Sequence, residues 1–186
     1  METLEDKYKH YCNTVSKYGH PMSLQSLEWL SAFVQRNDFK RVADFGSGFS
    51  SFVLRSTEGN SRDVFSYDTD DAWLGKTKQY LADQGFLGGE LIHYGRDKIV
   101  ADLDFIIWDL GNKDFRSKEF LAVADKFGDA ICLIDDCHDP RYLKMCHDLR
   151  DNEGYYIKEL TKMKDEFGRY CTAISTDKDK IEAIYE

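Results

Sequence analysis

The stretch that decides the fold is Val42-Ala43-Asp44-Phe45-Gly46-Ser47-Gly48-Phe49-Ser50-Ser51. It begins as an apolar run, passes through a Gly-x-Gly turn and ends in residues that can open a helix. Glycine has no Cβ, so these two positions let the backbone bend tightly and let a ligand approach the chain closely. The pattern predicts a strand, a ligand-binding loop and a helix; an ordinary strand-to-helix turn is the alternative.

An acidic residue follows this loop at an informative distance. Twenty residues after Gly48, Asp68 ends a second apolar run, Val64 to Tyr67. A carboxylate in this place can accept hydrogen bonds from both hydroxyls of a ribose. The loop and Asp68 together predict a site for an adenosine-containing cofactor.

Two details of the loop favour S-adenosylmethionine over a nicotinamide dinucleotide. A dinucleotide-binding loop would have glycine or alanine at position 51, where this chain has Ser51. Asp44 stands inside the first strand, and a carboxylate near the loop repels a pyrophosphate but suits a sulfonium or ammonium group. For Asp44 alone, a carboxylate that caps a turn is the alternative.

Outward from the loop, short apolar runs alternate with helix-length polar segments, which is typical of a parallel sheet with crossover helices. The predicted strands are 41–45, 64–67, 90–94, 105–108 and 130–134, and the predicted helices are 50–56, 71–84, 116–126 and 141–150. Only a turn or a single helical turn is expected between the third and fourth strands.

The two ends of the chain depart from this alternation. Residues 3–17 and a segment that begins after the N-cap Ser23 predict two helices before the sheet. The β-rich runs 155–160 and 170–175 predict an antiparallel hairpin at a sheet edge. We therefore expect an α/β fold, a doubly wound and mostly parallel sheet with a C-terminal antiparallel hairpin. A single domain over residues 1–186 is expected, with N-terminal helices in 1–38 and the core sheet in 39–176.

Two motifs resemble the class I S-adenosylmethionine-dependent methyltransferases, and the resemblance covers residues 20 to 176. Asp44-Phe45-Gly46-Ser47-Gly48-Phe49-Ser50-Ser51 is similar to the first motif of that family. Phe65-Ser66-Tyr67-Asp68-Thr69-Asp70-Asp71-Ala72-Trp73 is similar to the second-strand motif of a branch of small methyltransferases, in which Trp follows the acidic residue by five positions. The two motifs identify a cofactor fold and do not identify a substrate.

The resemblance also implies roles for individual residues. Asp44 would face the methionine end of S-adenosylmethionine, Gly46 and Gly48 would lie against the cofactor, and Asp68 would hold the ribose. A residue after the third strand would contact the adenine, for which Arg96 and Asp97 are the candidates. The predicted cofactor-binding residues are Asp44, Gly46, Ser47, Gly48, Ser50, Asp68, Thr69, Arg96, Asp97 and Asp109.

Carboxylates gather at the ends of the fourth and fifth predicted strands. Asp109 follows the fourth strand, and Asp135 and Asp136 follow the fifth. Strand ends in such a sheet converge on the ligand cleft. Three carboxylates there repel one another unless they are solvated, protonated or bound to a cation such as Mg2+ or Ca2+. A divalent metal site at Asp109, Asp135 and Asp136 and a solvated acidic rim are the two alternatives.

The same region is similar to the catechol-type O-methyltransferases, whose metal ligands are an Asp after strand four and an Asp-Asn pair after strand five. In this chain Asp136 replaces the Asn. Lys113 resembles the catalytic Lys of those enzymes but lies one residue further from the first ligand.

His138 is a second candidate base because histidine titrates near neutral pH; its alternative role is to cap the following helix. The predicted catalytic residues are Asp136, His138 and Lys113.

Charge and composition restrict the partners. The chain has 25 Lys and Arg against 34 Asp and Glu, a net charge of -9, which repels phosphate backbones and anionic lipid. Apolar runs reach roughly five residues against the ~20 that cross a bilayer. The acidic N-terminus does not resemble a secretory signal, so a cytoplasmic location is expected. No nucleic acid and no membrane are expected as partners.

The predicted function is methyl transfer from S-adenosylmethionine to a small-molecule acceptor, on oxygen, by in-line displacement. One alternative is a regulatory or partner-binding module that binds S-adenosylmethionine without transfer activity. A second alternative is a nicotinamide-dependent oxidoreductase. Aromatic side chains near the N-terminus, Tyr8, Tyr11, Tyr18 and Trp29, are expected either to line a lid over the substrate or to pack in the core. The oligomeric state stays open.

Overall fold

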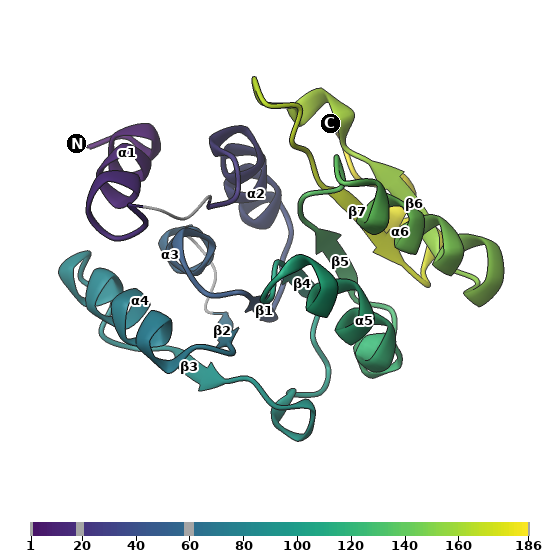
Figure 1. Cartoon of the computed structure of the whole chain (residues 1–186), viewed down its shortest axis with the longest axis horizontal. Helices are drawn as coiled ribbons and strands as arrows, with labels where there is room; N and C mark the ends of the chain where they lie inside the picture. Colours follow the sequence, from purple (N-terminus) through teal and green to yellow (C-terminus); the bar gives the residue numbers. More distant parts are fainter. Residues whose placement is uncertain (1, 18–20, 58–61, 186) are drawn as a thin grey trace.

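A computed structural model describes residues 2–17, 21–57 and 62–185. Its centre is a seven-stranded sheet with the strand order β3-β2-β1-β4-β5-β7-β6 (Figure 1). The strands are β1 (Arg41–Phe45), β2 (Asp63–Asp68), β3 (Glu90–His93), β4 (Phe105–Trp108), β5 (Ile131–Ile134), β6 (Tyr156–Glu159) and β7 (Thr172–Ser175). The first five run parallel, and β7 pairs antiparallel with both β5 and β6. The predicted fold class is confirmed, including the C-terminal hairpin.

Seven α-helices surround the sheet in the part of the chain that the structure describes. They are α1 (Leu4–Thr14), α2 (Leu24–Arg36), α3 (Phe49–Ser56), α4 (Asp71–Asp83), α5 (Lys113–Val123), α6 (Pro140–Glu153) and α7 (Lys178–Glu182). Helix α5 begins three residues before the predicted start because the side chain of Asn112 accepts a hydrogen bond from the amide of Phe115 and caps it. Helix α7 lies beyond residue 176, the predicted end of the core sheet. A 3-10 turn over Arg96–Lys98 links β3 to β4, as expected.

Alternate residues of each central strand point to opposite faces of the sheet, which gives the protein two buried apolar layers. Val42 and Phe105 belong to the layer that also contains residues of α1, α2, α3 and α4. Their neighbours Ala43 and Ile106 belong to the layer beneath α5 and α6. The sheet is therefore covered on both sides, and the runs of apolar residues in its strands follow from this double burial.

The strand register brings the ends of four parallel strands to one edge. Phe45 is level with Tyr67 of β2 and with Trp108 of β4, and Trp108 is level with Ile134 of β5. The next residue of each strand therefore lies at the same edge of the sheet. Because β1 leads outward to β2 on one side and lies beside β4 on the other, this edge contains the topological switch point where ligands bind in open α/β sheets.

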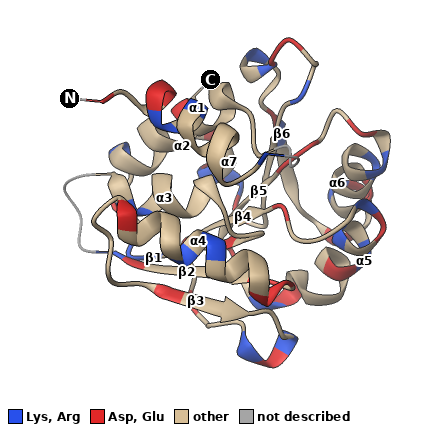
Figure 2. Cartoon of the chain, turned by 60° about the vertical axis from the view of Figure 1, so that its left-hand side comes forward, with Lys and Arg blue, Asp and Glu red and all other residues tan. Residues whose placement is uncertain are grey.

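The outer helices are charged. Figure 2 shows basic and acidic residues close together on α5 and α6, where Lys144 pairs with Asp148 and Arg141 pairs with Asp114.

Within the described residues, no helix combines the length and the apolar character needed to cross a lipid bilayer.

Candidate cofactor site and acidic cluster

A cavity of about 170 Å³ lies at the carboxyl ends of β1, β2 and β4. The loop after β1 forms one wall, and the residues that end β2 and follow β4 form another. The lining residues are Tyr11, Ser16, Pro21, Met22, Gly46, Ser47, Gly48, Phe49, Ser50, Asp68, Trp73, Asp109 and Gly111. The cavity is therefore at the switch point, where the sequence predicts a cofactor.

Gly46 is the position where the loop needs glycine. Its φ is +103°, a conformation that residues with a Cβ rarely adopt. A Cβ placed there would lie 2.4 Å from the carbonyl oxygen of Asp109. The amides of Gly46 and Ser47 both donate to the carbonyl of Tyr67, at 2.8 Å and 3.1 Å. The loop thus crosses directly over the ends of β2 and β4.

Asp68 ends β2 and lines the cavity. One carboxylate oxygen accepts hydrogen bonds from the amide of Ser47 at 3.0 Å and from its hydroxyl at 3.3 Å, and the other accepts from the amide of Asp70 at 3.1 Å. Burial raises the pKa of Asp68, and these hydrogen bonds act against the rise. A carboxylate has about four lone-pair sites, so an acceptor position is left for a ligand hydroxyl.

Asp44 does not face the cavity. Its side chain is fully buried, and it accepts hydrogen bonds from the hydroxyls of Ser50 at 3.1 Å, Ser51 at 2.6 Å and Ser66 at 2.5 Å. The predicted contact of Asp44 with the methionine end of the cofactor stays a prediction, and the three hydrogen bonds of its carboxylate agree with the alternative of a carboxylate that organises a turn. The hydroxyl of Ser51 also accepts from the amide of Gly48, which gives this side chain a structural reason to replace the third glycine of a dinucleotide loop.

The predicted cofactor-binding residues separate into two groups. Those that line the cavity are Gly46, Ser47, Gly48, Ser50, Asp68 and Asp109. Thr69 and Asp97 are exposed, and neither lines the cavity. Arg96 forms two hydrogen bonds of 2.7 Å to the carboxylate of Glu119 on α5 and does not line it either. The structure therefore provides no support for Arg96 or Asp97 beside an adenine.

Two aromatic residues complete the cavity wall. Tyr11 of α1 is fully buried, and its hydroxyl has no hydrogen-bond partner among the residues that the structure describes. Trp73 of α4 donates from its indole nitrogen to the carbonyl of Ser47 at 2.5 Å. Tyr11 is among the aromatics predicted to line a lid or the core, and Trp73 is part of the second motif, so the sequence contains a signal for both. Tyr18 lies outside the described residues.

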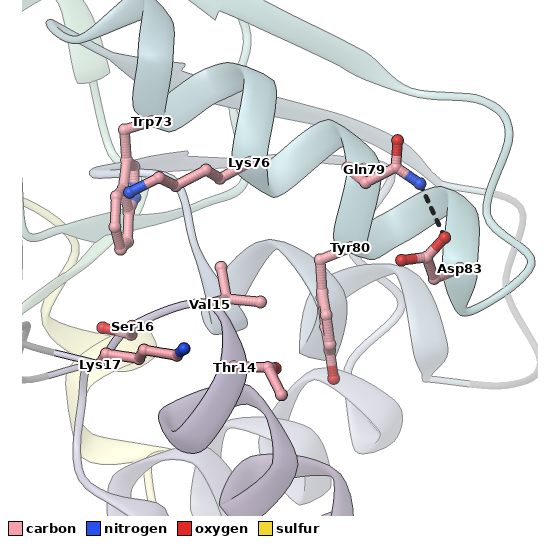
Figure 3. A pocket seen from close by; sticks show the side chains of 9 residues that line it. All are labelled: Thr14, Val15, Ser16, Lys17, Trp73, Lys76, Gln79, Tyr80 and Asp83. Carbon is pink, nitrogen blue, oxygen red and sulfur yellow. Dashed lines mark hydrogen bonds between the residues drawn. The ribbon is translucent and has the colours of Figure 1, made fainter.

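A second cavity, of about 420 Å³, lies between the end of α1 and α4 (Figure 3). Ser16 and Trp73 belong to the walls of both cavities. The ammonium group of Lys76 lies 5.1 Å from the centre of a Trp73 ring. The two cavities are therefore neighbours that meet at Ser16 and Trp73.

The carboxylates after β4 and β5 converge as predicted. Oxygen atoms of Asp109, Asp135 and Asp136 lie within 4.8 Å of one another. Burial raises the pKa of Asp109 well above its ordinary value, and burial together with the charge of Asp136 raises the pKa of Asp135 to about 6.

The cluster contains a cation that the sequence pattern does not reveal. Arg116 of α5 places one guanidinium nitrogen 2.5 Å from Asp109 Oδ1 and another 3.1 Å from Asp136 Oδ2. Its side chain is 9% exposed. Arg116 is the first residue of the predicted helix 116–126, and nothing in the helical pattern distinguishes it from an arginine that faces solvent.

The candidate bases lie around this cluster. His138 Nδ1 is 3.8 Å from Asp136 Oδ1. Lys113 Nζ is instead 3.2 Å from Asp139 Oδ2, and its side chain is 55% exposed. None of Asp136, His138 and Lys113 lines the cavity. The structure thus brings His138 and Asp136 together and directs Lys113 to a different carboxylate.

No known family model and no curated protein matches this sequence. Solved structures do match. A putative caffeoyl-CoA O-methyltransferase from Staphylococcus aureus has 15% identity and a TM-score of 0.72, with 94% of this chain and 93% of that chain covered. The O-methyltransferase from Bacillus cereus in complex with SAH has 12% identity and a TM-score of 0.71, with 92% and 88% covered. A putative rRNA-methylase from Clostridium thermocellum has 15% identity and a TM-score of 0.63, with 81% and 94% covered.

These similarities extend over most of each chain at low identity, so they concern the fold. They agree with the resemblance of the loop and of the second-strand motif to class I methyltransferases. The chain therefore has the Rossmann-like fold of the S-adenosylmethionine-dependent methyltransferases.

Proposed function

We propose that this protein transfers a methyl group from S-adenosylmethionine to an oxygen atom of a small-molecule acceptor. The observation that carries the proposal is the cavity at the switch point, which is lined by the glycine loop, by Asp68 and by Asp109. S-adenosylmethionine, when bound there, would supply a methyl group that forms a C–O bond with the acceptor as the C–S bond breaks.

The residues of the cavity fit the charge of this cofactor. Asp68 is acidic and lines the cavity, and a carboxylate there favours a sulfonium or an ammonium group over a pyrophosphate. Asp68 would accept hydrogen bonds from the ribose hydroxyls, and the glycine at position 46 keeps the loop close to the strand ends. The electrostatic preference that the sequence suggests for Asp44 would therefore come from Asp68, because Arg116 lies 2.5 Å from Asp109 Oδ1 and balances the charge of that carboxylate.

The acceptor would be held beside the ends of β4 and β5. An acceptor hydroxyl must lose its proton, and His138 beside Asp136 is the pair that would take it. The net charge of -9 favours a small molecule over a nucleic acid as the acceptor.

Calorimetry and a transfer assay test the proposal. The purified chain is titrated with S-adenosylhomocysteine and, separately, with NADH. It is then incubated with S-adenosylmethionine and a panel of catechols, phenols, carboxylic acids and amines, and the S-adenosylhomocysteine released is measured. We expect binding of S-adenosylhomocysteine, weaker or absent binding of NADH, and turnover with a hydroxyl acceptor.

Each other outcome favours a different function. Tight binding of S-adenosylhomocysteine without turnover on any acceptor would favour a regulatory module. Preferential binding of NADH would overturn the proposed cofactor.

A further inference from the structure

The resemblance to catechol-type O-methyltransferases implies a divalent cation at Asp109, Asp135 and Asp136. The three carboxylates lie close enough to share one ion, since an oxygen of each is within 4.8 Å of the others. Whether they fit a cation depends on what already contacts those oxygens.

Arg116 contacts two of the three carboxylates. It reaches inward from α5, with one nitrogen 2.5 Å from Asp109 Oδ1 and another 3.1 Å from Asp136 Oδ2. The guanidinium carbon also lies 5.1 Å from the ring centre of Tyr142 on α6. A buried guanidinium held by two carboxylates and an aromatic ring is a fixed positive charge in the middle of the cluster.

The third carboxylate also has a protein partner. Asp135 is 4% exposed, and its Oδ1 accepts a hydrogen bond from the thiol of Cys171 at 3.2 Å. A divalent ion bound by this cluster would have to displace Arg116 from the same oxygens or lie directly beside its positive charge. The residues present do not fit a metal site.

The backbone conformation of Asp136 allows its carboxylate to face both Arg116 and His138. Asp136 has φ +58°, in the left-handed region that is uncommon for residues other than glycine. In this conformation its Oδ2 reaches Arg116 while its Oδ1 is 3.8 Å from His138 Nδ1.

We propose that Arg116 occupies the place of a divalent cation in this protein, so that Asp109, Asp135 and Asp136 bind no metal ion while Arg116 is present. Arg116 offsets part of the negative charge at the ends of β4 and β5 and holds Asp109 in position beside the cofactor cavity. The proposal concerns cation binding, and it does not depend on whether the protein transfers methyl groups.

The test measures Mn2+ binding to the full chain by electron paramagnetic resonance of free Mn2+ and by calorimetry. We expect the wild-type protein to show no binding at this cluster at Mn2+ concentrations on the order of 1 mM. Arg116→Gln removes the positive charge and leaves the three carboxylates, and we expect it to bind Mn2+ at least about tenfold more tightly than the wild type. The double variant with Asp135→Asn should lose that gain.

Arg141→Gln is the matched control. Arg141 also pairs with carboxylates, Asp139 and Asp114, but outside the cluster, so its removal should leave Mn2+ binding unchanged. Circular dichroism of each variant shows whether it is folded.

Two results would overturn the proposal. One is a wild-type protein that binds one Mn2+ and loses it with Asp109→Asn or Asp135→Asn. The other is a folded Arg116→Gln protein that binds Mn2+ no better than the wild type. If Arg116→Gln does not fold, the wild-type titration alone decides.

Discussion

Gly46 shows how a single residue determines the geometry of the cavity. Its φ of +103° and the 2.4 Å that would separate a Cβ at this position from the carbonyl oxygen of Asp109 are two separate obstacles to any other residue. The first concerns the backbone conformation, and the second concerns the space over β4. A substitution that adds only a Cβ therefore tests both.

Gly46→Ala should lower the free energy of unfolding by about 3 kcal/mol or more, because backbone strain costs about 1–3 kcal/mol and the clash adds to it. Gly154→Ala is the control, because Gly154 also has a positive φ, +74°, but nothing lies within 4 Å of its Cβ position. It should cost only about 1–2 kcal/mol. Urea unfolding of both variants measures the difference, and equal losses would mean that the close approach to Asp109 is unimportant.

Asp68 is the residue proposed to bind the ribose of the cofactor. Asp68→Ala should weaken the binding of S-adenosylhomocysteine by about 1–3 kcal/mol, because it removes a charge-assisted acceptor for the ribose hydroxyls. Asp63→Ala, at the exposed opposite end of the same strand, should leave the affinity unchanged. Calorimetry on both proteins provides the comparison. Unchanged binding in a folded Asp68→Ala protein would reject the assigned role.

The residues whose position could be predicted from sequence are those placed by their own strand. Gly46, Asp68 and Asp109 line the cavity because each comes directly at the end of a parallel strand or just after it. Asp44 and Arg116 could not be interpreted in this way. Each has a partner nearby in the sequence, but each also has one on a distant element, Ser66 on β2 for Asp44 and Asp136 after β5 for Arg116. A one-dimensional pattern does not contain those distances.

At the scale of elements, the unit formed by β1, the glycine loop and α3 is held together by hydroxyl groups. Ser51 of α3 accepts from the amide of Gly48 at 3.1 Å and donates to the carboxylate of Asp44 at 2.6 Å. Both partners are buried, so the loss of this hydroxyl leaves each without that hydrogen bond.

Ser51→Ala should therefore lower the free energy of unfolding by about 1–3 kcal/mol. Ser56→Ala, at the end of the same helix, removes a single hydrogen bond from a half-buried hydroxyl to the carbonyl of Val53 and should change stability by at most about 0.5 kcal/mol. Thermal or urea unfolding measures both. A loss for Ser51→Ala no larger than that for Ser56→Ala would show that α3 does not need the two hydrogen bonds of the Ser51 hydroxyl.

The strands are more predictable than the helix ends. The apolar runs at 41–45 and 105–108 agree with β1 and β4 residue for residue, because strands buried on both faces must be apolar throughout most of their length. The start of α5 depends on one hydrogen bond from Asn112, and α7 is a five-residue helix capped by Asp177. Such short-range caps have weak sequence signals compared with a buried strand.

At the scale of the whole molecule, the edge where β1, β2, β4 and β5 end contains several acidic groups that are buried or half-buried. Asp109, Asp135 and Asp136 contribute three carboxylates, and Arg116 contributes one positive charge. The remaining negative charge is accommodated in part by protonation. Burial and the neighbouring Asp136 raise the pKa of Asp135 to about 6. The fold therefore binds a proton that the unfolded chain releases at lower pH.

Asp135 should make the stability of the whole fold depend on pH. Its pKa is about 6 in the folded protein and near 3.8 in the unfolded chain, so its contribution is fully present below pH 3.8 and is lost as the pH rises through 6. The loss can reach about 3 kcal/mol. Asp135→Asn removes the titrating group, so the variant should gain stability relative to the wild type between about pH 4 and pH 7, as measured by urea unfolding at several pH values.

Asp63→Asn provides the control for this profile, because Asp63 is exposed at the opposite end of the sheet. Its stability should follow that of the wild type at every pH. A constant difference between Asp135→Asn and the wild type across the range would show that the pKa of Asp135 is the same in the folded and the unfolded state. Proton uptake by Asp135 would then not contribute to the stability of the strand ends.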